Sequence, residues 1–171
     1  MIPDRAPLGP VRDAGGHTAD GSATLAWQSI GPMPIVNEYW SGTANAAGRV
    51  SSVIVSPTNG QIAYIAAAQG GVWKTTDGGA SWTPLTDGLS SLSSGALAFD
   101  PADENVLYYG TGEQHFSGDS FYGDGLFRSM DAGASWAKIA TKASAGSYIA
   151  RVAVKPGDSN SILVASDRDL V

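Results

Sequence analysis

Short runs of strand-forming residues separated by polar turns are the dominant pattern of this chain. Three runs end in proline and read RVSSVIVSP, GALAFDP and RVAVKP at residues 49–57, 95–101 and 151–156. Each is followed by a polar turn and a second apolar run, which begins at Ile62, Val106 and Ile162. Strand residues between turn residues indicate antiparallel β-strands, and no segment has the length and period of an amphipathic helix. We therefore predict an all-β fold.

A 12-residue segment occurs twice, as GVWKTTDGGASW at residues 71–82 and GLFRSMDAGASW at residues 125–136. Strand formers precede the turn of each copy and a tryptophan follows it, which predicts a hairpin. The carboxylates of Asp77 and Asp131 are placed to accept hydrogen bonds from backbone N–H groups of their own turns. The tryptophans carry more apolar surface than one hairpin buries, which favours stacked sheets.

Both segments resemble the Asp-box, S/T-x-D-x-G-x-S/T-W, of the BNR repeat found in sialidases, xyloglucanases and sortilin-type receptors. The matching residues are Thr75, Asp77, Gly79, Ser81 and Trp82, then Ser129, Asp131, Gly133, Ser135 and Trp136. In this family the box joins the third and fourth strands of a β-propeller blade. The resemblance implies an incomplete β-propeller of four-stranded antiparallel blades. A turn-capping role for the two aspartates explains the whole motif, whereas the alternative would make them catalytic.

The spacing of the runs divides the chain into blades. Pro57 and Pro101 lie 44 residues apart, and Pro101 and Pro156 lie 55 residues apart, close to the roughly 40 to 50 residues of a propeller blade. We predict blade 1 over residues 49–89, blade 2 over 95–140 and an incomplete blade 3 over 150–171. The proline-to-Asp-box spacing grows from 20 residues in blade 1 to 30 in blade 2. This places a ten-residue insertion after Glu113, between the second and third strands.

The two ends of the chain carry further expectations. Residues 26–30, AWQSI, resemble the fourth strands SWTPL and SWAKI, and we expect them to form an outer strand that completes the last blade. Residues 1–25 are rich in Pro, Gly, Asp and Ala and lack the apolar core of a signal peptide, which predicts a disordered leader. A third box is expected near position 176, so we interpret the chain as a fragment. An uncovered blade face favours self-association.

The amino-acid composition argues against several classes of partner and cofactor. The net charge is -6, and no Lys/Arg cluster is present to displace counterions, which argues against nucleic acid. The absence of cysteine excludes disulfides and thiolate metal sites. His17 and His115 are isolated and residues 119–124 do not match a calcium loop, so we predict no metal and no cofactor. We expect no membrane span. The resemblance implies an extracellular or cell-envelope protein, although no signal peptide is visible.

The insertion and one earlier loop hold the candidate binding residues. In a propeller, the loops between strands two and three lie on the face where ligands generally bind. Aromatic rings there would stack on sugars while carboxylates accept hydrogen bonds from hydroxyl groups; alternatively, the aromatics fold the loop onto a small core and the aspartates cap turns. The candidates are Glu38, Tyr39, Trp40, Glu113, His115, Phe116, Asp119, Phe121, Tyr122 and Asp124.

Three functions remain open. Glycoside hydrolysis requires two carboxylates ~5 to 10 Å apart, and Glu113, Asp119 and Asp124 are candidates without a specified pair. Xyloglucanases carry a catalytic aspartate in an RTDVGG-like segment, where this chain has AAAQGG with Ala68 and Gln69; the Arg-Ile-Pro segment of sialidases is absent. We therefore predict a module that binds a glycan, protein or peptide through its loop face. The alternatives are a glycoside hydrolase whose other catalytic residues lie in further blades, and a scaffold without a ligand.

Overall fold

The computed structural model describes residues 48–115, 118–167 and 169–170, and most of them belong to antiparallel sheets. The first sheet has the order β1-β2-β3-β4, formed by Val50–Val55, Ala63–Ala67, Gly71–Thr75 and Thr83–Pro84. The second sheet has the order β5-β6-β7-β8, formed by Ser94–Phe99, Leu107–Thr111, Leu126–Ser129 and Ala137–Ala140. The third contains β9 (Ile149–Lys155), β10 (Asp158–Ser166) and β11 (Asp169–Leu170).

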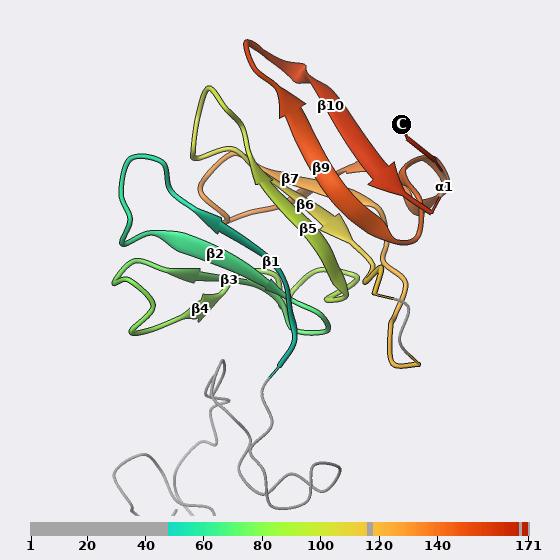
Figure 1. The fold of residues 1–171 in the computed structure, drawn as a ribbon, viewed down its shortest axis with the longest axis horizontal. Helices are drawn as coiled ribbons and strands as arrows, with labels where there is room; N and C mark the ends of the chain where they lie inside the picture. The colour runs from blue at the N-terminus through green and yellow to red at the C-terminus, as the bar shows by residue number, and fades with distance from the viewer. Residues whose placement is uncertain (1–47, 116–117, 168, 171) are drawn as a thin grey trace, which may run out of the picture.

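The three sheets follow one another as blades, with β1 beside β5 and β5 beside β9 (Figure 1). The first strand of each sheet therefore lies on the inner side of the array. The predicted fold class, an incomplete β-propeller of four-stranded antiparallel blades, is confirmed. The predicted outer strand over residues 26–30 and the predicted leader over residues 1–25 lie outside the described residues. A short helix that the sequence did not indicate, α1 (Lys142–Ala145), precedes β9.

The second sheet is buried on both faces. Tyr108 and Tyr109 are adjacent on β6 and both are fully buried, because successive side chains of a strand point to opposite faces. Tyr109 belongs to the core between the first and second sheets, with Tyr64, Val72, Leu97, Leu107 and Phe127. Tyr108 belongs to the core between the second and third sheets, with Leu126, Ile149, Val152 and Val164. This double burial explains the continuous apolar run around β6.

The fourth strand of the first blade is shorter than the apolar pattern predicts. The sequence indicates a strand over residues 81–85, but β4 covers only Thr83–Pro84. Ser81 belongs to the preceding turn, where its backbone N–H donates to the Asp77 carboxylate. Pro84 has no N–H and cannot donate to the ladder, as is usual for an edge strand.

Two sheet faces carry exposed apolar side chains. Val53 and Val55 on β1 alternate with Ile54, which packs into the first core, and both are exposed. Leu163 on β10 likewise alternates with the buried Val164 and is exposed. Within the described residues, no further sheet covers these side chains. Self-association through these faces remains a proposal.

Candidate functional site

The loop between β6 and β7, residues 112–125, carries the predicted insertion, and its described residues are anchored at several points. The carbonyl of Phe121 accepts hydrogen bonds from the Glu113 backbone N–H at 3.1 Å and from Ser93 Oγ at 2.5 Å. The N–H of Gly123 donates to the Ser147 carbonyl at 2.7 Å. A Cβ at Gly123 would lie 2.3 Å from backbone and side-chain atoms of Thr111, so only glycine permits this close approach. The loop is thereby held against the second and third blades.

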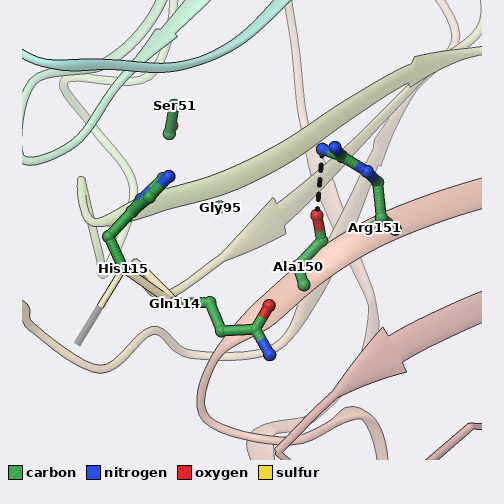
Figure 2. Close-up of a pocket in the computed structure, with 6 residues that line it drawn as sticks. All are labelled: Ser51, Gly95, Gln114, His115, Ala150 and Arg151. Atoms are coloured by element: carbon green, nitrogen blue, oxygen red, sulfur yellow. Dashed lines mark hydrogen bonds between the residues drawn. The ribbon is translucent and has the colours of Figure 1, made fainter.

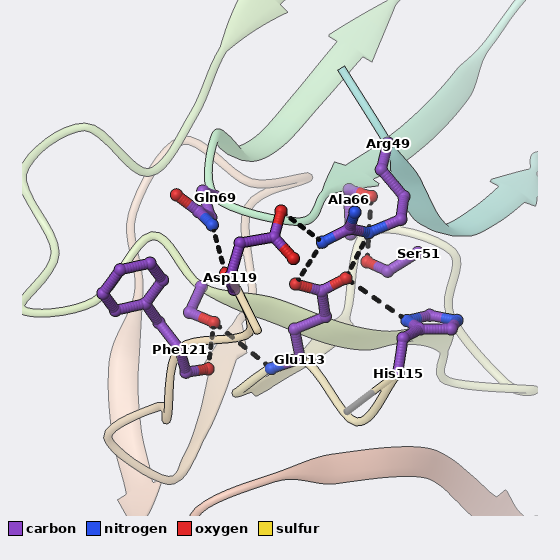
Figure 3. A network of polar contacts seen from close by, with 9 residues as sticks. Arg49, Ser51, Ala66, Gln69, Glu113, His115, Asp119 and Phe121 are labelled. Atoms are coloured by element: carbon purple, nitrogen blue, oxygen red, sulfur yellow. Dashed lines mark hydrogen bonds and ion pairs between the residues drawn. The ribbon is translucent and has the colours of Figure 1, made fainter. Parts of the chain in front are cut away.

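Glu113 lies at the centre of a polar network on this loop (Figure 3). Its side chain is fully buried, with 0% exposure. Its Oε2 accepts a hydrogen bond from Arg49 Nη2 at 2.8 Å, and its Oε1 accepts one from Arg49 Nε. These hydrogen bonds raise the pKa of the Arg49 guanidinium. Arg49 directly precedes β1 and Glu113 follows β6, so the two-point ion pair joins the first blade to the second.

Two more candidates lie in the same network. Nη2 of Arg49 also reaches Oδ2 of Asp119 at 3.4 Å, and the Gln69 amide donates to the Asp119 backbone carbonyl at 2.5 Å. His115 Nδ1 lies 3.5 Å from Glu113 Oε1. The structure therefore brings together Glu113, His115 and Asp119 and adds Arg49, which is not among the candidates from the sequence. The signal that could have found Arg49 is a basic residue directly before an inner strand.

Asp124 is engaged by groups other than Arg49. Its carboxylate accepts hydrogen bonds from Lys138 Nζ at 2.5 Å and from Ser90 Oγ. The hydrogen bond from Lys138 is the largest cause that lowers the pKa of Asp124, and the Ser90 hydroxyl adds to it. An ionised carboxylate held by an ammonium group is poorly suited to donate a proton at neutral pH.

Two consecutive aromatic residues in the described part of the loop, Phe121 and Tyr122, are both exposed. Phe121 is 56% exposed and Tyr122 is 62% exposed, so neither ring is buried in a core of the loop. Lys142 Nζ lies 4.1 Å from the centroid of the Tyr122 ring, in a cation–π contact. A cavity of about 280 Å³ lies beside them and is lined by Gln69, Ser91, Leu92, Ser93, Phe121 and Tyr122. The candidates Phe116, Glu38, Tyr39 and Trp40 lie outside the described residues.

The first repeated turn is closed by its aspartate. Asp77 Oδ1 accepts hydrogen bonds from the Ser81 backbone N–H at 2.9 Å and from Thr75 Oγ1 at 2.8 Å, and Oδ2 accepts one from Ser81 Oγ at 2.6 Å. These bonds, the Ser81 hydroxyl foremost, lower the pKa of Asp77 to about 2. Gly79 has a φ of 96°, and its carbonyl accepts a hydrogen bond from Trp82 Nε1 at 3.1 Å.

The second repeated turn has the same contacts. Asp131 accepts hydrogen bonds from the Ser135 backbone N–H at 2.8 Å, from Ser135 Oγ at 2.6 Å and from Ser129 Oγ at 2.8 Å, which lower its pKa. Gly133 has a φ of 92°. Trp136 differs from Trp82, because its buried Nε1 has no hydrogen-bond partner within the described residues and its ring packs edge-on against Tyr109. Antiparallel topology places both turns at the opposite end of the blades from the β6–β7 loop, which supports a turn-capping role.

Neither a metal-binding cluster nor a membrane-spanning helix is found among the described residues. In the described part of the chain, no three His, Cys, Asp or Glu side chains are grouped so as to hold a metal ion. No helix among the same residues has the length and apolar character needed to cross a membrane.

The sequence and the structure of this chain are similar to parts of known xyloglucanases and GH74 enzymes. No known protein-family model matches the chain. It is 29% identical over 170 residues to a xyloglucanase of Hypocrea jecorina. The match covers 84% of this chain and 19% of that protein. It is also 29% identical over 153 residues to the xyloglucanase Xgh74A of Acetivibrio thermocellus, covering 80% of this chain and 16% of that protein. The chain therefore spans less than a fifth of the length of these curated relatives.

Solved structures agree with these sequence relatives. The crystal structure of an ancestral GH74 enzyme superposes with a TM-score of 0.58 at 26% identity, covering 84% of this chain and 15% of that one. The GH74 enzyme of Niastella koreensis gives a TM-score of 0.50 at 21% identity, covering 67% of this chain and 17% of that one, and supports the fold alone. This chain is a set of β-propeller blades similar in sequence and structure to part of the GH74 xyloglucanases.

Proposed function

We propose that this chain supplies part of the glycan-binding face of a propeller related to glycoside hydrolases. The observation that carries the proposal is the pair of exposed rings, Phe121 and Tyr122, on a loop whose backbone is pinned by hydrogen bonds. Exposed aromatic rings suit recognition, because they offer a large contact area with little conformational entropy to lose. The pinned backbone presents them with little further cost of ordering.

The surroundings of the rings suit a polyhydroxylated ligand. Gln69, Ser91 and Ser93 line the cavity beside Phe121 and Tyr122 and carry amide and hydroxyl groups able to hydrogen-bond sugar hydroxyls. Because the relatives are named xyloglucanases, the ligand class that we propose is a xyloglucan-like β-glucan. Such polysaccharides lie outside cells, and we accordingly propose an extracellular setting. In this proposal Asp77 and Asp131 stabilise their turns and do not contact the ligand.

The test is the affinity of the protein, expressed from its complete reading frame, for xyloglucan oligosaccharides. Phe121→Ala and Tyr122→Ala are each expected to weaken binding by about 1 to 2 kcal/mol, as the loss of an aromatic contact usually does. Met130→Ala is the matched control, since Met130 is also exposed but lies in the second box turn at the other end of the blade. Unchanged affinity in both aromatic variants, measured by calorimetry, would refute the proposal.

Glycoside hydrolysis is the second candidate, and the similarity to xyloglucanases favours it. The described carboxylates suit supporting roles better than proton transfer. Glu113 is buried in the fork of Arg49, and Asp124 is held by Lys138. Where the family's catalytic aspartate would fall, this chain has Ala68, which is buried, and Gln69, and neither is an acid.

Release of reducing ends from xyloglucan separates the two functions. Glu113→Gln and Asp119→Asn are the informative variants, with folding checked by circular dichroism. Turnover in the wild type that is lost in a folded Glu113→Gln or Asp119→Asn protein supports hydrolysis by this chain. Binding without turnover supports the binding module.

A further inference from the structure

A second cavity lies on the inner side of the blades, and it shares no lining residue with the cavity beside Phe121 and Tyr122. Its volume is about 240 Å³. Figure 2 shows the six residues that line it, which are Ser51, Gly95, Gln114, His115, Ala150 and Arg151. Four of the six come from the first strands of the three sheets, β1, β5 and β9. The cavity is therefore built by the junction of all three blades.

Small residues at one equivalent position create this space. Ser51, Gly95 and Ala150 are each the second residue of their strand. Gly95 cannot be replaced by a larger residue without rearrangement, because a Cβ would lie 1.9 Å from the Ile149 carbonyl oxygen and 2.4 Å from that of Gly112. The backbone of Gly95 therefore lies close to the backbones of Ile149 and Gly112 beside the cavity.

The side chains around the cavity are rich in hydrogen-bond donors. Arg151 on β9 is exposed, and its Nη1 donates to the Ala150 carbonyl at 3.5 Å, which is long for a hydrogen bond. A guanidinium carries five N–H donors in a planar fork that matches a carboxylate. The amide of Gln114 adds two further N–H donors. A ligand that only accepts hydrogen bonds fits this lining.

The acidic groups near the cavity are already compensated. Glu113 faces His115 but is held by both nitrogens of the Arg49 fork, and Asp119 contacts the same guanidinium. Among the residues that the structure describes, Arg151 forms no ion pair with a carboxylate. Among the described residues, no carboxylate neutralises the positive charge that Arg151 brings to the cavity, which disfavours a metal cation and favours an anion.

We propose that this cavity binds a carboxylate group through Arg151 and Gln114. The proposal rests on the proposed glycan-binding function in one respect, the source of the carboxylate, which we assign to an acidic sugar residue such as a uronic acid. Arg151 then discriminates acidic from neutral glycans. Phe121 and Tyr122 bind sugar rings of either kind.

The test compares two ligands with the same glucan backbone, cellohexaose and the same hexasaccharide whose C6 hydroxymethyl groups are oxidised to carboxylates. Calorimetry on the protein from its complete reading frame is expected to show roughly tenfold or tighter binding of the acidic ligand, the usual effect of hydrogen bonds to a charged group. Arg151→Gln should abolish that preference and leave the affinity for cellohexaose unchanged. Lys155→Gln is the matched control, because it removes a positive charge from the same strand outside the cavity.

Each outcome separates this inference from the proposed function. Equal affinity of the wild type for both hexasaccharides would overturn the carboxylate site and leave the glycan-binding proposal intact. If neither hexasaccharide binds, free glucuronate decides the cavity, and the titration with xyloglucan oligosaccharides decides the glycan-binding proposal. Saturable binding of glucuronate that is lost in Arg151→Gln supports the site, and absence of binding to the wild type refutes it.

Discussion

The guanidinium of Arg49 holds both carboxylate oxygens of Glu113, and this ion pair crosses from the first blade to the second. The carboxylate is fully buried, whereas the guanidinium is partly exposed. Glu113 occupies the blade-2 position that corresponds to Gln69 in blade 1, where the sequence invites a search for a catalytic acid. Because this carboxylate is buried and paired with the Arg49 guanidinium, we infer that Glu113 positions the loop that carries Phe121 and Tyr122.

Breaking this ion pair is expected to destabilise the fold. Arg49→Met leaves the Glu113 carboxylate buried without a cation, which should lower the free energy of unfolding by about 3 kcal/mol. Asp119→Asn removes an exposed partner of the same guanidinium and should cost less than about 1 kcal/mol. Urea unfolding followed by circular dichroism measures both. Equal effects of the two variants would contradict the assigned difference in burial.

The aspartates of the two turns should make stability depend on acid pH. The folded-state pKa of Asp77 is about 2, below its ordinary value of 3.8, so the unfolded chain takes up the proton first as the pH falls. The stabilisation is therefore complete above the unfolded-state pKa and is lost as the pH falls towards the folded-state value. Asp131 shifts in the same direction.

Thermal unfolding of the wild type and of Asp77→Ala at a series of pH values measures this dependence. The difference in melting temperature should be constant near neutral pH and shrink below the ordinary pKa of the carboxyl group. A difference that stays constant down to the lowest pH would show that the carboxylate does not stabilise the turn.

Ala132 offers a stabilising substitution. It has a φ of 56°, in the left-handed region, whereas the corresponding residue of the first turn is Gly78, with a φ of 71°. The Ala132 carbonyl accepts hydrogen bonds from Tyr64 and Lys74 of the first blade, which hold the backbone in this conformation. Ala132→Gly should therefore raise the free energy of unfolding by about 0.5 to 1 kcal/mol.

Ala134→Gly is the control for that substitution, because Ala134 lies in the same turn without a positive φ. It gains no relief of strain and is expected to be neutral or slightly destabilising. A lower melting temperature for Ala132→Gly than for the wild type would contradict the argument.

The exposed apolar faces predict self-association of the 171-residue chain. Val53 and Val55 on β1 and Leu163 on β10 are exposed, and exposed apolar surface of this kind promotes association. Sedimentation velocity should show species larger than the monomer, and the double substitution Val53→Lys and Val55→Lys should reduce them. Met130→Lys is the control, since it adds a charge at an exposed apolar residue of a turn. A wild-type chain that is monomeric at every concentration would refute the prediction.

Local features of the fold followed from the sequence because their causes are local. Alternation and proline positions predicted strands where β1, β5 and β9 lie, and the ten-residue difference in spacing predicted the long connection between β6 and β7. The short β4 was not predicted, because Ser81 is drawn into the turn by Asp77 and Pro84 cannot extend the ladder. The sequence pattern also did not indicate α1.

By itself the sequence determined the all-β blades, their order and the position of the long loop that carries most of the candidate binding residues, since these depend on contacts within a few tens of residues. Only the tertiary structure decided which side chains of that loop meet. Arg49 and Glu113 are 64 residues apart in the chain, and their pairing depends on how one blade packs on the next. The cavity beside Arg151 arises in the same way, because four of its six lining residues come from the first strands of three blades.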